Sequence, residues 1–271
     1  MSPPLEDTGA ETGTARWLAG YLLVGYSLPG EETSASVVIT VGGHVLFKSR
    51  RQAASLLAPQ VADALQKDGD FQPSSAVVIG LPRGGVLVAR DIALALRCPL
   101  DVLVSKTIGA PQNPDFLIGA VSSAGIAVLD QPSLEYFRVS SQYVETQKRR
   151  LTAESQALEQ QWVQEAGLQG RHSLEGKWVV VVGDGVATGM TARTALRTVR
   201  LHDVRKLILA APVMSFHAFR GLKDECDQLI ALCLPYDFVN ISQFYDDYRQ
   251  IDDSQVILCL KQAAAVSATP V

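Results

Sequence analysis

The sequence of 271 residues has few cysteines, no excess of basic residues and no long apolar run. None of its four cysteines, Cys98, Cys226, Cys233 and Cys259, lies in a C-x-x-C pair, so we expect buried thiols in a reducing compartment rather than a metal or redox centre. The apolar stretch from Trp17 to Tyr26 is too short to cross a bilayer. A formal net charge of -4 disfavours a protein that neutralises a nucleic-acid backbone. These absences predict a cytoplasmic protein without a membrane or nucleic-acid partner.

Length and composition predict one main domain with an addition at each end. With 47% hydrophobic residues, the chain can bury one sizeable core. Residues 1–46 are expected to form an N-terminal extension, in which a polar tail precedes a hairpin with strands at Val37–Val41 and His44–Phe47. Residues 47–235 would form the core, and residues 236–271 a C-terminal hood and helix.

Apolar runs and amphipathic segments alternate through most of the chain. Strands are predicted at Ala76–Ile79, Leu100–Val104, Leu117–Val121, Ile126–Leu129, Trp178–Val182, Leu207–Ala210 and Leu229–Leu232. Helices are predicted at Arg50–Leu65, where Pro59 could split the element, and at Gly85–Arg97, Gly189–Leu201 and Ser215–Glu225. The polar segment Ser133–Gly167 is typical of one or two exposed helices. Strands separated by helices predict an α/β fold, with a mostly parallel sheet that carries helices on both faces.

The most informative segment is the turn from Asp184 to Thr191, between a buried strand and a helix. The first amides of a helix have no partner within the helix, and the helix dipole favours negative charge there. Thr188 and Thr191 add hydroxyl donors, and Asp184 could accept hydrogen bonds from a sugar diol or help to hold Mg²⁺. A phosphorylated ribose would satisfy both parts of the turn. The alternative is a turn whose polar residues only cap the helix.

Two other glycine-bearing segments follow predicted strands. In Gly80–Gly85 the glycines let the backbone approach an anion and Arg83 supplies a forked cation, although a connector with a solvated arginine would look the same. Ser105–Pro114 is rich in glycine and proline and carries Lys106. An ordinary surface loop is the competing interpretation of that segment.

In their order and spacing these motifs resemble those of type I phosphoribosyltransferases. Asp184–Thr191 matches D-x-x-x-T-G-x-T, the signature for 5-phosphoribosyl pyrophosphate (PRPP), and Leu81–Gly85 resembles the pyrophosphate loop. Phe47–Arg50, Ile108–Pro111, Ile118–Val121 and Phe244–Tyr248 also follow the order found in stand-alone bacterial members predicted to be phosphoribosyltransferases. The resemblance covers roughly Phe47 to Lys261. It implies transfer of a phosphoribosyl group from PRPP, with Mg²⁺, to a nitrogen acceptor and release of pyrophosphate.

The resemblance also assigns roles to individual residues. Asp184 would hold the ribose hydroxyls and the metal, and together with Arg83 and Lys106 would act in catalysis. The 5-phosphate would lie on Gly185, Val186, Ala187, Thr188, Gly189, Met190 and Thr191. The pyrophosphate would lie on Pro82, Arg83, Gly84 and Gly85. Tyr236, Phe238 and Tyr245 would contact the acceptor in the hood.

The chain departs from the family pattern at several positions. Gly183 stands where type I enzymes carry a first acidic residue, and Ala187 stands where some relatives keep an acidic base. Glu159–Trp162 represents an arginine-rich stretch, and Lys106-Thr107 represents a basic pair. Each change removes charge that a diphosphate ligand would favour, so catalysis is in question.

Other functions therefore stay open. One is a non-catalytic sensor that binds a phosphorylated ribose or nucleotide and contacts a protein partner through residues 1–46 and 133–167. Regulation by RNA binding is disfavoured by acidity. A dinucleotide-binding domain is disfavoured because no G-x-G-x-x-G follows a strand with an acidic residue about twenty positions later. A homodimer is the commonest soluble assembly.

Overall fold

The computed structural model describes residues 16–18, 21–26, 36–39, 47–67 and 69–267. The predicted polar tail lies outside these ranges. Within them, no helix combines the length and the apolar character that a bilayer span requires.

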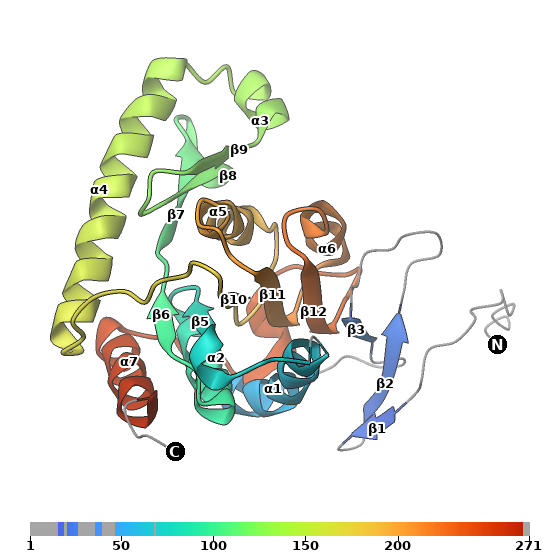
Figure 1. The fold of residues 1–271 in the computed structure, drawn as a ribbon. Helices are drawn as coiled ribbons and strands as arrows, with labels where there is room; N and C mark the ends of the chain where they lie inside the picture. The colour runs from blue at the N-terminus through green and yellow to red at the C-terminus, as the bar shows by residue number, and fades with distance from the viewer. Residues whose placement is uncertain (1–15, 19–20, 27–35, 40–46, 68, 268–271) are drawn as a thin grey trace, which may run out of the picture.

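An eight-stranded sheet forms the centre of the molecule, in the order β1-β2-β3-β12-β11-β10-β5-β6 (Figure 1). Its strands are β1 (Arg16–Leu18), β2 (Tyr21–Tyr26), β3 (Ser36–Ile39), β5 (Ala76–Gly80), β6 (Leu100–Val102), β10 (Trp178–Val182), β11 (Lys206–Val213) and β12 (Gln228–Cys233). Across the sheet from β3 to β6, each strand is parallel to the next. The antiparallel pairs of this sheet are β1 with β2 and β2 with β3. The predicted mostly parallel sheet is confirmed.

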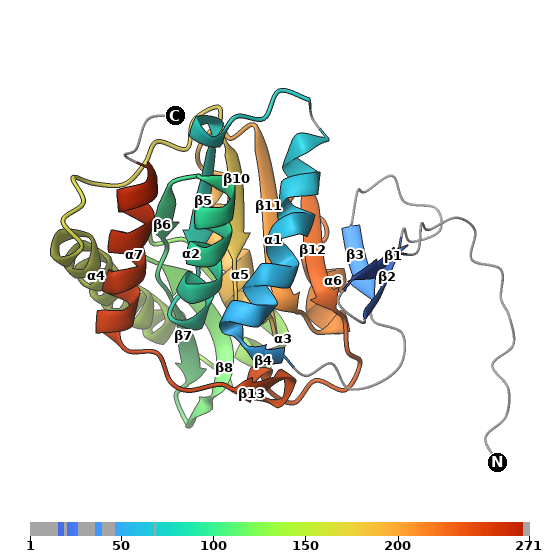
Figure 2. The ribbon, with the colours of Figure 1, turned by 90° about the horizontal axis from the view of Figure 1, so that it is seen from below.

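Helices cover both faces of this sheet. On one face lie α1 (Arg50–Gln66), α2 (Gly84–Leu96) and α7 (Asp253–Ser267), which stand in front of the strands in Figure 2. On the other face lie α5 (Met190–Val199) and α6 (Phe216–Leu222). Val179 and Val181 of β10 pack against α5 and α6, whereas Val180 and Val182 pack with the α1 and α2 side. Because successive strand residues point to opposite faces, a strand covered on both sides must be apolar throughout.

Two local predictions were wrong. Phe47 does not pair with the strand near Val37, because it belongs to β4 (Phe47–Ser49), which runs parallel to β13 (Tyr245–Asp247). β3 pairs instead with β2 and β12, and residues 40–46 lie outside the described ranges. Pro59 does not split α1, because Leu57 and Val61 on either side of it are fully buried and hold the helix to the core.

The segment after β6 forms a separate antiparallel sheet, which we call the flap. It consists of β7 (Ser105–Ala110), β8 (Asn113–Ser122) and β9 (Ala127–Leu129). The predicted hairpin of β8 and β9 is confirmed. The competing interpretation of Ser105–Pro114 as an ordinary surface loop is wrong, because hydrogen bonding to β8 makes its first six residues a strand. Local glycine and proline signals do not report a partner strand that follows in the chain.

Two helices follow the flap, α3 (Gln131–Tyr136) and the long α4 (Ser141–Glu165), which passes alongside the flap in Figure 1. The prediction of two helices is correct, but α4 is not exposed all round. Leu151 and Trp162 are buried, and the carboxylate of Glu159 lies on the same buried face. The remaining short elements are η1 (Pro73–Ser75) and η2 (Ile241–Phe244).

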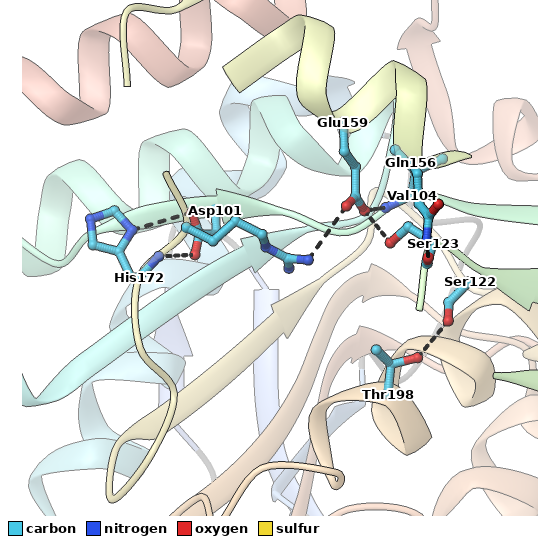
Figure 3. A network of polar contacts seen from close by, with 9 residues as sticks. Asp101, Val104, Ser122, Ser123, Gln156, Glu159, His172 and Thr198 are labelled. Atoms are coloured by element: carbon cyan, nitrogen blue, oxygen red, sulfur yellow. Dashed lines mark hydrogen bonds and ion pairs between the residues drawn. The ribbon is translucent and has the colours of Figure 1, made fainter. Parts of the chain in front are cut away.

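Glu159 holds the base of the flap, as Figure 3 shows. Its Oε1 accepts hydrogen bonds from the amide of Val104, at 2.5 Å, and from the hydroxyl of Ser123, at 2.7 Å. Val104 directly precedes β7 and Ser123 directly follows β8, so one carboxylate joins the start of the β7–β8 hairpin to its end. Gln156 adds a bond to the carbonyl of Ser123, at 2.8 Å.

The same network ties down the connection from α4 to β10 (Figure 3). Arg171 forms an ion pair with Glu159 at 3.4 Å, and the buried Asp101 of β6 accepts bonds from the amide and the ring nitrogen of His172. The hydrogen bond to Asp101 raises the pKa of His172 above its ordinary value. Burial raises the pKa of Glu159, against the opposing influence of Arg171. The network therefore places a carboxylate next to the start of the flap, in a buried position that disfavours its charged form.

We predict that Glu159 makes stability depend on pH. Because its pKa is raised in the folded state, the folded protein keeps a proton that the unfolded chain releases just above its ordinary pKa of 4.5. The free energy of unfolding should therefore fall as pH rises from that value through the raised pKa. Glu159→Gln keeps an oxygen acceptor but cannot ionise, so urea titrations across this interval should show a smaller fall. Glu165→Gln, at an exposed position of the same helix, is the control. Equal slopes for the wild type and Glu159→Gln would contradict this.

Candidate functional site

The two loops predicted to bind anions lie side by side at one edge of the sheet. We call Gly80–Gly85 the first loop and Asp184–Thr191 the second loop, and both together the anion loops. β5 and β10 are parallel neighbours, with Gly80 opposite Val182, so the loops that follow them leave the sheet together. The amide of Leu81 donates to the carbonyl of Val182 at 2.8 Å. A Cβ at Gly85 would lie 2.7 Å from that same carbonyl oxygen, which shows how closely the backbones approach. In the first loop the Pro82–Arg83 peptide is cis.

Asp184 begins the second loop and is almost buried, with 9% of its surface exposed. Its Oδ2 accepts a hydrogen bond from Nε of Arg50 at 2.8 Å and another from the hydroxyl of Tyr248 at 3.0 Å. The hydroxyl of Tyr245 donates to the carbonyl oxygen of Asp184 at 2.6 Å. Gly84 leaves room for this arrangement, because a Cβ there would overlap with Oδ2. Asp184 therefore faces the first loop and is fixed in place by three other side chains.

Arg50 is the side chain that joins these elements. It is the first residue of α1, where Ser49 caps the helix, and only 8% of it is exposed. Its guanidinium lies over the ring of Tyr248, 3.9 Å from the centroid, and Nη1 donates to the carbonyl of Arg249 at 3.0 Å. The pairing of β4 with β13 brings the C-terminal segment to α1 and so makes these contacts possible.

The two tyrosines act as hydrogen-bond donors at neutral pH. Burial raises the pKa of Tyr245, and burial together with the Asp184 carboxylate raises the pKa of Tyr248 to about 12. Sequence reasoning assigned no role to Arg50 or Tyr248. A signal was available for Arg50, because it precedes Ala54 and Leu57 at helical spacing and so belongs to the buried face of α1.

The remainder of the second loop surrounds the start of α5. The amide of Val186 donates to the carbonyl of Val213 at 2.9 Å, which holds the loop against β11. Gly189 has a φ of 79°, in the left-handed region that favours glycine. Within the described part of the chain, the amides of Thr188 and Thr191 donate no hydrogen bond, and Thr188 is exposed. Open amides at a helix start favour an anion, and anion binding at this one stays a prediction.

The predicted cations already have carboxylate partners. Nε of Arg83 lies 2.8 Å from Oδ1 of Asp253 at the start of α7, and both side chains are more than a third exposed. Nζ of Lys106 lies 2.6 Å from Oε2 of Glu154, and this contact lowers the pKa of Glu154. Exposed pairs of this kind contribute little to stability, so either cation can turn toward a ligand at small cost.

The C-terminal segment covers the second loop, as expected for a hood. Ile241 lies against Gly185, where an added Cβ would be 2.6 Å from Cγ2 of the isoleucine. Tyr236 is 80% exposed and contacts the ring of Phe216, and Phe238 contacts Phe244. Tyr245 is only 5% exposed and packs on Phe47 at 5.5 Å, so its ring presents little surface to an acceptor. Acceptor contacts through Tyr236 and Phe238 stay a prediction.

The donors at this edge do not fit a magnesium ion held by the protein. Mg²⁺ requires octahedral oxygen coordination, often from one or two carboxylates with phosphates and water. Gly183 supplies no carboxylate, and Oδ2 of Asp184 is already bound by Arg50 and Tyr248. Across the described ranges, no group of three or more His, Cys, Asp or Glu side chains could hold a metal.

Comparison with known proteins links this arrangement to one family. A family model described as a phosphoribosyl transferase domain matches residues 57–249. Two strains of Mycobacterium tuberculosis contain a curated protein, provisionally named a phosphoribosyl transferase, that is 32% identical over 220 residues. The match covers 80% of this chain and 47% of that protein, so the chain spans about half the length of these relatives.

A solved structure is also similar. The crystal structure of TT1426 from Thermus thermophilus superposes with a TM-score of 0.64 at 34% identity. The superposition covers 80% of this chain and 98% of that one.

We predict that alanine destabilises the protein at Gly84, in the first loop, and is tolerated at Gly183, directly before the second loop. At Gly84 a Cβ would overlap with Asp184 and lie 2.7 Å from Nε of Arg50, so Gly84→Ala must displace the buried pair. We expect a loss of about 1–3 kcal/mol in the free energy of unfolding. At Gly183 the nearest atom would be 3.4 Å away, an ordinary contact, so Gly183→Ala should be tolerated. Thermal unfolding of both variants tests this, and equal melting temperatures would disprove it.

Proposed function

This chain belongs to the phosphoribosyl transferase family, and we propose that it binds PRPP and transfers the phosphoribosyl group to a nitrogen acceptor with release of pyrophosphate. The proposal rests on one observation above all: the two anion loops leave neighbouring parallel strands and lie against each other. A sugar with a phosphate at one end and a diphosphate at the other needs two such loops a few ångströms apart.

Each loop is proposed to hold one end of the ligand. The 5-phosphate would lie at the start of α5, where unpaired amides and the helix dipole favour negative charge. The diphosphate would lie on Pro82–Gly85, with the Arg83 guanidinium turned from Asp253 toward it. Lys106 would approach from the flap, where Glu159 holds the start of β7 and the end of β8. Asp184 would accept hydrogen bonds from the ribose hydroxyls.

The reaction itself needs positioning and charge stabilisation more than proton transfer. The bond between the anomeric carbon and the diphosphate oxygen breaks with its electron pair on the departing diphosphate, and the acceptor nitrogen forms the new bond. Positive charge on the ribose and negative charge on the leaving group grow together, so fixed cations near the diphosphate lower the barrier. Ala187 offers no base in the loop, so the acceptor nitrogen would lose its proton to solvent.

Members of the family generally use PRPP with Mg²⁺. Since the carboxylates of this chain do not fit an ion held by the protein, Mg²⁺ would enter with the diphosphate, whose oxygens and water coordinate it. No step of the proposal depends on a metal held by Asp184. We further propose that the protein is a cytoplasmic enzyme that acts on small molecules. It would form a homodimer or bind a protein partner through residues 1–46.

A second candidate function follows from the state of Asp184. Its carboxylate is paired with Arg50, and Gly183 replaces the adjacent acid, so the chain could keep ligand binding after losing turnover. It would then act as a sensor of a phosphorylated ribose or nucleotide that passes the signal to a protein partner.

Calorimetry with PRPP tests binding. The wild type should give saturable heat, and Asp184→Asn, once thermal unfolding shows that it is folded at the assay temperature, should weaken affinity about tenfold or more, because a charge-assisted hydrogen bond to the ribose becomes a neutral one. Asp63→Asn, on the exposed face of α1, should bind like the wild type. The absence of heat with the wild type at millimolar PRPP would refute the proposed function.

Gly183→Asp separates the two candidates. The space at this position admits a Cβ, and thermal unfolding of the variant first establishes that the buried position also accommodates the second carboxylate. If the chain is an eroded enzyme, pyrophosphate release from PRPP with candidate bases should rise about tenfold, in line with one regained charged hydrogen bond. Unchanged binding with no turnover in either protein would favour the sensor.

A further inference from the structure

In the buried pair of Arg50 and Asp184, the charge of the guanidinium balances the charge of the carboxylate. The side chains are 9% and 12% exposed, and they meet at 2.8 Å. Arginine does not lose its proton in proteins, so the pair carries one fixed positive and one fixed negative charge. Removing either partner would leave a buried charge without compensation, which is strongly destabilising.

Two further contacts hold the guanidinium in one orientation. The ring centroid of Tyr248 lies 3.9 Å from it, and the carbonyl of Arg249 accepts from Nη1 at 3.0 Å. Both contacts come from the C-terminal segment. On the other side, a Cβ added at Gly84 would lie 2.7 Å from Nε, so the loop proposed to bind diphosphate leaves room for the guanidinium. The positive charge therefore lies between the two loops, against Oδ2 of Asp184.

We propose that Arg50 takes the place of a divalent cation beside Asp184, so that the chain binds phosphorylated ribose without Mg²⁺. The inference rests on the proposed function and specifies how that site is charged. It accounts for Gly183, because a second carboxylate beside a single guanidinium would leave an unpaired negative charge near a phosphate. It is also in keeping with the donors, because Oδ2 of Asp184 is bound by Arg50 and Tyr248 and Gly183 adds no second carboxylate.

Asp184 can still bind the sugar in this state. The described contacts of its carboxylate all go to Oδ2, from Arg50 and from Tyr248. Oδ1 is thus left to accept from a ribose hydroxyl, and Arg50 keeps the carboxylate in the orientation that this requires. We regard Arg50 as a positioning residue, because it acts through Asp184.

The first experiment measures binding of ribose 5-phosphate to the full chain by calorimetry, with millimolar Mg²⁺ or with EDTA. This ligand lacks the diphosphate, which would itself bring Mg²⁺ to the site. We expect the two dissociation constants to agree within about twofold, less than 0.5 kcal/mol. Affinity at least tenfold tighter with Mg²⁺ would overturn the inference but leave the proposed function standing. No binding of ribose 5-phosphate in either condition would overturn the inference, whereas the proposed function is decided separately by calorimetry with PRPP.

Variants at residue 50 test the charge of the side chain through the effect of Mg²⁺ on affinity, which a purely structural role of Arg50 would leave unchanged. Arg50→Gln keeps a hydrogen-bond donor for Asp184 but removes the charge, so Mg²⁺ should now improve affinity about tenfold. Arg50→Lys restores the charge and should restore independence from Mg²⁺. Arg51→Gln, at the next and exposed position of α1, should behave like the wild type. An Arg50→Gln variant that stays indifferent to Mg²⁺ would contradict the substitution of arginine for a metal.

Tyr248→Phe covers the case in which Arg50→Gln does not fold. It removes one hydrogen bond from Oδ2 and keeps the ring against Arg50. Because the guanidinium stays, binding of ribose 5-phosphate to this variant should remain independent of Mg²⁺. Dependence on Mg²⁺ in Tyr248→Phe would show that the guanidinium alone does not compensate Asp184, and would overturn the inference.

Discussion

The ion pair between Arg50 and Asp184 is the interaction on which the candidate site depends. It connects three parts of the chain that are far apart in sequence: the start of α1, the loop after β10 and the segment around β13. A buried pair of this kind is stable only when the remaining donors and acceptors find partners. Here Tyr248 and the carbonyl of Arg249 supply them, and Gly84 leaves the space. The two anion loops keep their mutual position because this pair lies between them.

The departures from the family pattern take on a structural meaning. Glu159 and Trp162, where an arginine-rich stretch was expected, lie on the buried face of α4. Glu159 holds the start of β7 and the end of β8 together, and the ring of Trp162 is fully buried in the core on the α1 and α2 side. The backbone of Ala187 accepts a hydrogen bond from Ser215 at 2.5 Å, so this position holds the loop instead of supplying a base. At these positions the chain has contacts that stabilise the scaffold.

The structural features of the site bear on ligand binding more directly than on catalysis. The start of α5, the close approach at Gly85 and the oriented Asp184 are all present, and they favour a bound sugar phosphate. What the chain lacks is the second carboxylate and a base in the loop. Positioning can accelerate a transfer that needs little proton movement, so an enzyme and a sensor share the same geometry and differ in what happens to the diphosphate.

The sequence by itself determined the parallel sheet, its helices and the two anion loops. Those features are encoded locally, because apolar residues at spacings of 2 and 3.6 report strands and helices, and glycine before a helix reports its open amides. The flap strand at Ser105–Ala110, the pairing of Phe47 with Tyr245 and the Arg50 contact with Asp184 were decided only by the tertiary structure. Arg50 and Asp184 are 134 positions apart, and no local pattern reports which charged side chains meet in a core. Their pairing depends on the tertiary arrangement, in which β4 pairs with β13 and the loop after β10 lies beside the loop after β5.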